Sequence, residues 1–289
     1  KSTRSKIEEN SLAIRLAVNA SWVVNWFLLI VKTIAVIISS SKAVTAALAD
    51  SVVDLASQAI LSVANHYIAK HSPKYPVGRS RLEALSVIGC AFIMSMASIE
   101  VIQYSAVDLF DGLNGHLPQL YVSLDLYIIL GVGIALKLAL WIYCVKINEN
   151  IGSDTVTALA EDHFNDVISN GVAVVTAAIA YHTVAWWVDP VGAIFISLVI
   201  IYRWGEIIHE QVKKIVGHTA PPEFIQQIEE LALAHDERIQ VDCTRVYHFG
   251  ARFNVEMEIV LPGHLTVVES HDLALELQHK IESLIDVER

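Results

Sequence analysis

The stretch LAEDHFNDVISNG, residues Leu159 to Gly171, decides how the N-terminal part of the chain is interpreted. It lies inside a segment rich in Ala, Val and Ile, residues 155–181, which has the composition of a membrane helix. Asp162 and Asp166 are four residues apart in it, so they lie on the same face of a helix. Charged side chains at membrane depth are costly and usually face a cavity or a partner. The stretch therefore predicts a functional pair of carboxylates inside a helix.

The composition of the whole chain agrees with a membrane protein. Of 289 residues, 54% are hydrophobic and 18% are charged, whereas soluble domains average about 25% charged residues. A spanning helix needs about 20 mostly apolar residues. The sequence predicts an all-α transmembrane domain at 1–216 and a soluble domain at 217–289. Its six predicted spanning helices are residues 12–40, 43–69, 83–110, 121–146, 155–182 and 188–214.

The basic residues of the short loops predict the orientation. They gather at the N-terminus and after the second and fourth predicted helices, as Lys1, Arg4, Lys6, Lys70, Lys74, Arg79, Arg81 and Lys146. Loops rich in Lys and Arg stay in the cytosol. Both termini are therefore expected to be cytosolic.

The C-terminal segment changes pattern. PPEFIQQIEELALAH predicts a helix, IQVDCTRVYHFGARFNVEMEIVLPG predicts two strands around a glycine turn, and VVESHDLALELQHKIESLI predicts a second helix. The order α-β-β-α indicates a small α+β domain, in which a last strand would be expected and is missing before Arg289. Residues 217–289 contain 14 acidic and 5 basic residues. This charge suits divalent cations and argues against a nucleic-acid partner.

A second carboxylate pair occurs in LADSVVDLASQ, residues 48–58, where Asp50 and Asp54 are again four residues apart. If the two helices face each other, four carboxylates converge, and their repulsion favours protonation. A divalent cation removes this repulsion, and its entry displaces protons. The sequence therefore predicts cation/proton exchange.

Several other polar residues lie near the two pairs. Gln58, Asn165 and Asn170 are expected either to supply neutral oxygens and hydrogen bonds near the site or to join helices. His163, one position after Asp162, is rotated by about 100° on a helix and is expected to lie off the shared face. Two isolated charges in the third and fourth predicted helices, Glu100 and Lys137, are further candidates: Glu100 as a proton group or as a partner of Lys137.

At these residues the sequence resembles the cation diffusion facilitators, a family of divalent metal/proton antiporters. YPVGRSRLEAL (75–85) resembles the loop that leads into the third helix of the family, and WWVDPVGAI (186–194) resembles the entry to its sixth. KLALWIYC (137–144) and FGARFNVEMEIVLP (249–262) resemble its manganese-transporting branch. The resemblance implies six helices, a cytosolic α+β domain and a transport site formed by Asp50, Asp54, Asp162 and Asp166.

The resemblance also indicates which metal is transported. Zinc-transporting members typically have His where this chain has Asp162. Imidazole suits zinc, whereas carboxylates suit harder ions such as Mn²⁺. We therefore expect Mn²⁺ export from the cytosol by alternating access. Fe²⁺ or Zn²⁺ transport and a non-transporting metal-sensing membrane protein are the alternatives. No catalytic triad or phosphate loop is recognisable, so neither an enzyme nor a bound cofactor is expected.

Partners and location follow from the same resemblance. The chain is expected to be a homodimer in a lipid bilayer, to use protons as counter-ions, and to lie in an endomembrane or vacuole if the organism is eukaryotic. A cytosolic metal site of the kind found in the family would use His271 with Glu256 or Glu258. The preferred alternative for these residues is a solvated acidic surface.

Overall fold

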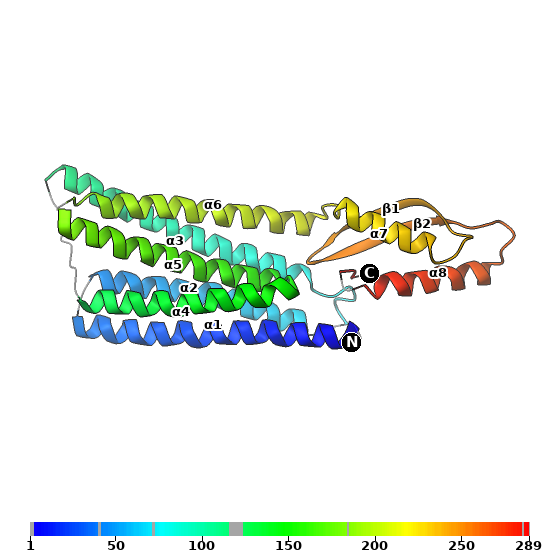
Figure 1. The fold of residues 1–289 in the computed structure, drawn as a ribbon, viewed down its shortest axis with the longest axis horizontal. Coiled ribbons are helices and arrows are strands. Elements are labelled where there is room, and N and C mark those ends of the chain that lie inside the picture. Colours follow the sequence, from blue (N-terminus) through cyan, green and yellow to red (C-terminus); the bar gives the residue numbers. More distant parts are fainter. Residues whose placement is uncertain are drawn as a thin grey trace.

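The computed structural model describes residues 3–39, 42–70, 73–115, 124–183, 185–284 and 286–288. In these ranges six long helices form an elongated bundle, followed by a smaller C-terminal unit at one end (Figure 1). The N-terminal end of the first helix and the last segment of the chain both lie near the junction of the two parts. The helices are α1 (Thr3–Ser39), α2 (Lys42–Ala69), α3 (Arg81–Leu113), α4 (Leu124–Ile151), α5 (Asp154–Thr183) and α6 (Val188–Val216).

Five helices of the described chain are long and apolar enough to cross a membrane: α1, α2, α3, α4 and α6. The helix outside this set, α5, carries four acidic residues in its first half, Asp154, Glu161, Asp162 and Asp166. The chain thus has the helices of a multi-pass membrane protein, and α5 differs from its neighbours by its acidic residues.

The predicted helix ends differ from the observed ones by a few residues, except that α1 begins at Thr3 rather than at residue 12. The segment before Leu12 is polar, but it contains good helix formers and no Gly or Pro. A prediction based on the length of the apolar stretch starts the helix at its first apolar residue, although the helix also includes the polar residues before it. Residue 40, residues 121–123 and Lys1, all used in the predictions, lie outside the described residues.

The apolar core of the bundle lies in the half next to the C-terminal unit. It combines the fully buried Trp204 of α6 with small residues of α3 and α5, such as Ala91 and Ala158. α3 packs along α6, α4 along α5, and α2 against both α1 and α3. Close packing in this half leaves the other half free to hold a cavity.

The C-terminal unit contains α7 (Pro222–Leu233), β1 (Gln240–Phe249), β2 (Arg252–Val260) and α8 (Val267–Glu282). The predicted order α-β-β-α is therefore confirmed. β1 and β2 are antiparallel, with Val246 opposite Val255, and their apolar side chains form a core with those of α7 and α8. α8 begins with a reciprocal cap in which hydrogen bonds from Thr266 lower the pKa of the Glu269 carboxyl.

The last residues of the chain pair with β2. The N–H of Phe253 donates to the carbonyl of Asp286, and the N–H of Glu288 donates to the carbonyl of Phe253, each at 2.8 Å. This contact is a parallel bridge between Phe253 and Val287. Among the described residues the sheet has the two strands β1 and β2, and residues 286–288 add a single bridge beside β2 rather than a third strand. Such a short segment has no alternating pattern from which a strand can be predicted.

The turn of the β hairpin contacts the start of α3. The Ser80 hydroxyl donates to the carbonyl of Phe249 at 3.2 Å, and the Arg81 guanidinium lies 4.2 Å from the centre of the Phe249 ring. Gly250 has a φ of +73°, and a Cβ there would lie 2.9 Å from the carbonyl carbon of Ser80. Only glycine fits this contact between the C-terminal unit and the bundle.

Gly250→Ala is expected to lower stability by about 1–3 kcal/mol, because a side chain is disfavoured at this φ and meets the backbone of Ser80. The readout is the thermal unfolding temperature of the full chain in detergent. Gly263→Ala is the matched control, since among the described residues a Cβ at Gly263 has no neighbour within 4 Å. Equal unfolding temperatures of the two variants would contradict the role of Gly250.

Candidate metal site

The two predicted carboxylate pairs approach each other in the middle of the bundle through a lysine. Lys137 of α4 is almost fully buried, with 3% of its side chain exposed. Its Nζ donates to Oδ2 of Asp54 on α2 at 2.9 Å and forms a second close ion pair with Oδ2 of Asp166 on α5. One ammonium group thus links a carboxylate from each pair, and Glu100, the alternative partner, is exposed.

A cavity of about 270 Å³ lies beside this contact. Its walls include Asp50, Asp54, Lys137 and Asp166. Most of the lining residues come from the halves of the helices that are remote from the C-terminal unit, whereas Met94 of α3 and Asn165 and Asp166 of α5 lie just on the near side of the helix midpoints. The cavity therefore extends from the middle of the bundle, where it meets Met94 of the apolar core, toward the far end of the bundle.

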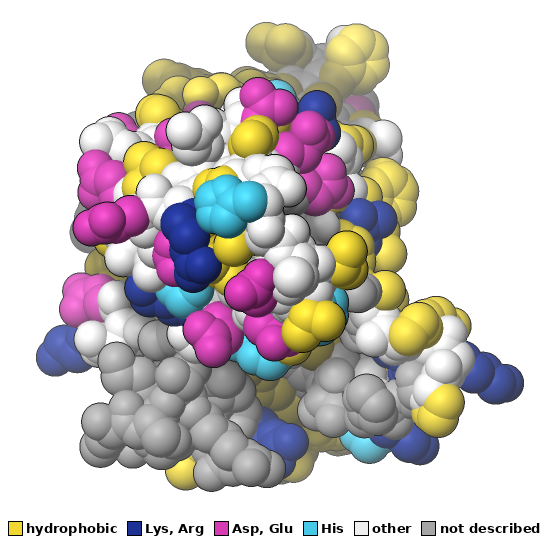
Figure 2. All heavy atoms as spheres, turned by 90° about the vertical axis from the view of Figure 1, so that its right-hand side faces the viewer, with side chains coloured by type: hydrophobic (Ala, Val, Ile, Leu, Met, Phe, Trp, Pro, Cys, Tyr) yellow, Lys and Arg dark blue, Asp and Glu magenta, His cyan; other side chains and the backbone are white. Residues whose placement is uncertain are grey.

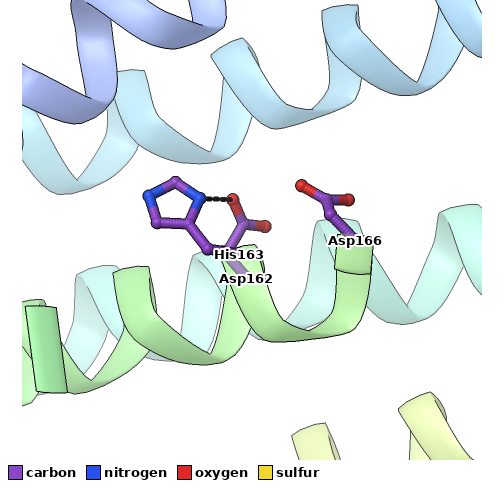
Figure 3. A group of neighbouring side chains, drawn as sticks. All are labelled: Asp162, His163 and Asp166. Atoms are coloured by element: carbon purple, nitrogen blue, oxygen red, sulfur yellow. Dashed lines mark ion pairs between the residues drawn. The ribbon is translucent and has the colours of Figure 1, made fainter. Parts of the chain in front are cut away.

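Asp162 lies one turn closer to the C-terminal unit and is 2% exposed. Its Oδ2 is 4.0 Å from Nδ1 of His163, and Oδ1 has no hydrogen-bond partner among the described residues. Figure 3 shows the side chains of Asp162, His163 and Asp166 on one side of α5. Each of the three offers one ligand atom within 4.8 Å of the others.

The expectation that His163 lies off the carboxylate face was wrong. His163 and Asp166 are three residues apart, a spacing that makes them neighbours on a helix as much as a spacing of four does. The imidazole is fully buried, and its Nε2 is 2.9 Å from the hydroxyl of Ser21 on α1. This contact holds His163 beside the carboxylates.

The three predicted amide neighbours have different places. Asn165 and Asn170 line the cavity. Asn165 is buried, and both polar atoms of its side chain lack a partner within the described chain, which leaves an oxygen available to an ion or water. Gln58 is buried away from the cavity, where it accepts from Asn25 at 2.8 Å and donates to the carbonyl of Val18 at 3.0 Å. Gln58 joins α2 to α1.

A second lysine lies farther along the cavity. Lys32 of α1 donates to the carbonyl of Ala47 at 2.9 Å and to the hydroxyl of Ser51 at 2.7 Å. It is 7% exposed, and its nitrogen bonds neutral oxygens of α2. This part of the bundle thus contains four carboxyl groups, those of Asp50, Asp54, Asp162 and Asp166, and two ammonium groups.

Polar contacts close the bundle at the end next to the C-terminal unit. Oε1 of Glu83 on α3 accepts from the hydroxyl of Ser153 at 2.9 Å and from the N–H of Thr155 at 3.1 Å. Nζ of Lys214 on α6 donates to both oxygens of Asp154 at 2.6 and 2.8 Å. These contacts hold the start of α5 against α3 and α6, and we call this set of five residues the α5 clamp.

About two turns farther along α5, a further ion pair joins α6 to α5. Nη2 of Arg203 lies 2.7 Å from Oε2 of Glu161, and the guanidinium lies 4.6 Å from the centre of the Phe164 ring. Beyond it the path to the carboxylates is filled by the apolar core. The site is therefore reached from the cavity side and closed on the other.

The predicted cytosolic metal ligands take part in other contacts. Glu256 accepts from the Tyr247 hydroxyl, Glu258 lies 3.5 Å from Nη1 of Arg245, and exposed His271 lies 3.3 Å from Asp272. Within the described residues, the group of three ligands that lie together is Asp162, His163 and Asp166. Carboxylates are nevertheless scattered over this end of the molecule, among basic, histidine and apolar side chains (Figure 2).

Sequence reasoning missed two parts of the site. Lys137 was noted as a charge in an apolar helix, but its contact with two carboxylates depends on how α4 is rotated, which no short motif reveals. Glu83 lies just inside the start of α3 and has the appearance of an ordinary first-turn carboxylate. Its contact with the start of α5, about 70 residues later, is a tertiary one.

Comparison with known families gives two matches that cover most of the chain. Residues 18–216 match the cation efflux transmembrane domain. Residues 220–289 match the cytoplasmic domain of cation efflux proteins.

Individual relatives are similar along nearly the whole chain. Metal tolerance protein 7 of Oryza sativa subsp. japonica is 34% identical over 99% of this chain and 72% of its own length. Metal tolerance protein 10 of Arabidopsis thaliana is 33% identical over 99% of this chain and 66% of its own length. Metal tolerance protein 5 of Oryza sativa subsp. japonica is 34% identical over 100% of this chain and 68% of its own length.

These matches agree with a buried carboxylate site in a multi-pass bundle that carries an α+β unit at one end. Members of the family are transporters rather than enzymes, and the resemblance read from the sequence motifs is confirmed at the level of the family. The chain belongs to the cation efflux, or cation diffusion facilitator, family of metal transporters.

Proposed function

We propose that the protein exchanges Mn²⁺ for protons across a membrane, with Asp50, Asp54, Asp162 and Asp166 as the transport site. The observation that carries the proposal is the cavity, which ends at Asp54 and Asp166 in the middle of the bundle. Carboxylates gathered in a poorly solvated place bind either a divalent cation or protons. Competition between the two couples the flux of one to the flux of the other.

The ligand chemistry supports manganese. The site offers carboxylates from α2 and α5, and the buried amide of Asn165 adds a neutral oxygen. Oxygen ligands suit hard cations such as Mn²⁺, whereas imidazole and thiolate select softer ones. His163 is the nearby nitrogen ligand: Ser21 engages its Nε2, and its Nδ1, 4.0 Å from Oδ2 of Asp162, adds one nitrogen to a set of mostly oxygen ligands. Fe²⁺ ranks second as the transported ion, and Zn²⁺ third.

The shape of the bundle supports alternating access. We place the C-terminal unit, residues 217–289, and both termini in the cytosol, and the bundle of residues 1–216, with α5 as its sixth span, in the membrane. In that orientation the cavity faces away from the cytosol, so this conformation releases metal and takes up protons. The α5 clamp must open in the opposite conformation to admit metal from the cytosol.

Assembly and location complete the proposal. The match of residues 220–289 to a cytoplasmic domain of efflux proteins supports dimerisation through this part, with two copies of the chain in one lipid bilayer. The relatives named above come from plants, which supports an endomembrane or vacuolar location in a eukaryotic cell.

The proposal is tested by transport in reconstituted vesicles. Vesicles with an acidic interior should accumulate Mn²⁺, and an internal pH indicator should report loss of protons when Mn²⁺ is added outside. A series of Mn²⁺, Fe²⁺, Zn²⁺ and Co²⁺ at equal concentrations ranks the ions. Metal uptake without proton movement would overturn antiport, and a higher rate with Zn²⁺ would overturn the manganese preference. Tight metal binding without uptake would identify a metal sensor instead.

Opening of the α5 clamp should be detectable through two native cysteines. Cys90 and Cys144 are fully buried in the apolar core. Lys214→Met removes the ion pair with Asp154, and a hydrogen bond to a charged group contributes roughly 1.5–3 kcal/mol. The labelling rate of these thiols by a maleimide is therefore expected to rise about tenfold or more.

The matched control for this labelling experiment is Lys213→Met. Lys213 precedes Lys214 and lies 3.8 Å from Glu210 on the exposed side of α6. Both variants are compared in a background with Cys243, in the C-terminal unit, replaced by Ser. Equal labelling rates in the two variants would show that the α5 clamp does not keep this end closed.

A further inference from the structure

Lys137 occupies the position that a bound cation would need. Its ammonium group contacts Oδ2 of Asp54 and Oδ2 of Asp166, one oxygen from each of the two helices that supply the transport site. An ammonium and a metal ion cannot share the same oxygen lone pairs at bonding distance, so the lysine and the metal compete.

We propose that Lys137 is a tethered cation that holds Asp54 and Asp166 together between transport events, excludes monovalent cations and yields only to a divalent one. The inference rests on the proposed transport site. Na⁺ or K⁺ brings the same charge as the ammonium, which is already present at high effective concentration. A divalent ion brings twice that charge to the same carboxylates, and in a poorly solvated site this difference is large.

The structure provides room for the lysine to withdraw. Lys137 lines the cavity, as does Gly133 one helical turn earlier on α4. Side chains on a helix lean toward its N-terminus, so Lys137 leans toward Gly133. Among the described residues, a Cβ at Gly133 would have no neighbour within 4 Å. The long flexible side chain of lysine can move its charge into this space when metal arrives.

The other buried lysine provides a comparison inside the same cavity. Lys32 donates to a backbone carbonyl and to the hydroxyl of Ser51, and both of these acceptors are neutral. Its charge does not occupy metal-binding oxygens. Lys32→Met and Lys137→Met therefore make the same chemical change, but only the second removes a competitor for the site.

The experiment measures Mn²⁺ binding to the full chain in lipid nanodiscs. Free Mn²⁺ is followed by its electron paramagnetic resonance signal while NaCl replaces choline chloride at constant ionic strength. Wild type and Lys32→Met should bind Mn²⁺ with little dependence on Na⁺. Lys137→Met should bind Mn²⁺ about tenfold more tightly without Na⁺ and lose that gain as Na⁺ rises, because Na⁺ now enters the vacated site.

A substitution that fills the space beside Lys137 provides an independent test. Gly133→Leu fills the room into which Lys137 withdraws, so it should weaken Mn²⁺ binding in the wild-type background. The same change should have little effect when Lys137→Met is also present, because no side chain then needs to withdraw. Effects that simply add would overturn the proposed movement.

Control variants separate this inference from the proposed function. Asp54→Asn should weaken Mn²⁺ binding whatever Lys137 does, and if it does not, the transport site itself is wrong. If Asp54→Asn weakens binding but Lys137→Met remains insensitive to Na⁺, only the role of Lys137 is wrong. Lys137→Arg, which keeps the charge, should retain resistance to Na⁺.

Folding is checked by the thermal unfolding temperature with and without Mn²⁺. Loss of the ammonium leaves carboxylates facing one another, so Lys137→Met should be less stable than wild type without metal and should recover with Mn²⁺. Lys137→Gln, whose amide still donates hydrogen bonds, serves if Lys137→Met is not obtained. Failure of both variants to fold even with Mn²⁺ would show that the lysine is only a structural cation, which overturns the proposal.

Discussion

Asp166→Asn is expected to abolish Mn²⁺ transport, with a loss of roughly 100-fold or more, since changes to groups that merely orient metal ligands already lower affinity 10–100-fold. Asp166 lines the cavity and contacts Lys137. Asparagine keeps the size of the side chain but removes the negative charge that attracts the cation. The measurement is the initial rate of Mn²⁺ uptake into vesicles with an acidic interior.

The control for this prediction is another aspartate of the same cavity. Asp189 at the start of α6 also lines it, but its Oδ1 accepts a hydrogen bond from Thr176 at 2.5 Å. Asp189→Asn should keep most of the transport rate. Similar losses in both variants would mean that the total charge of the cavity, rather than the position of Asp166, determines transport.

Asp162→His is expected to move the preference from Mn²⁺ toward Zn²⁺. Asp162 is buried next to His163, with ligand atoms of both close to those of Asp166. A second imidazole would give the site two nitrogen ligands, which favours zinc. We expect the ratio of Zn²⁺ to Mn²⁺ uptake to rise roughly tenfold or more. Metal affinity commonly changes by about 10–100-fold when groups around the ligands are replaced.

The result is compared with Asp189→His, which places an imidazole in the cavity away from this cluster. That change should leave the ratio of the two metals near its wild-type value. An unchanged ratio in Asp162→His, with uptake intact, would remove the argument that Asp162 sets the metal preference.

Much of the fold was predictable because the helices and strands have clear patterns. The apolar segments placed the ends of α2, α5 and α6 within a few residues, and alternation in residues 252–260 placed β2. The short segment at 286–288 was not predictable, since two hydrogen bonds to Phe253 form it rather than any pattern of its own. In α5 the prediction considered Asp162 and Asp166, which are four residues apart, but not His163 and Asp166, which are three apart. It therefore placed His163 off the face that it shares with Asp166.

The site was predictable in its charges more than in its contacts. The spacing of Asp50 and Asp54, and of Asp162 and Asp166, indicated one face on each of two helices. How these faces are arranged depends on the rotation and depth of α4, which supplies Lys137. Packing of several helices determines that rotation, so the structure was needed to place the ammonium between Asp54 and Asp166.

The contact of Glu83 with the start of α5 has a consequence for the kinetics of opening. The first amide groups of a helix have no partner inside it and carry a partial positive charge. Glu83 satisfies one of these groups at Thr155 and places a negative charge beside this end of the helix dipole. When this end of the bundle opens, the hydrogen bonds of Glu83 to Ser153 and Thr155 break, and water molecules must replace them at the same time. The rate of opening should therefore depend on hydration of this end, and osmolytes that withdraw water should slow it.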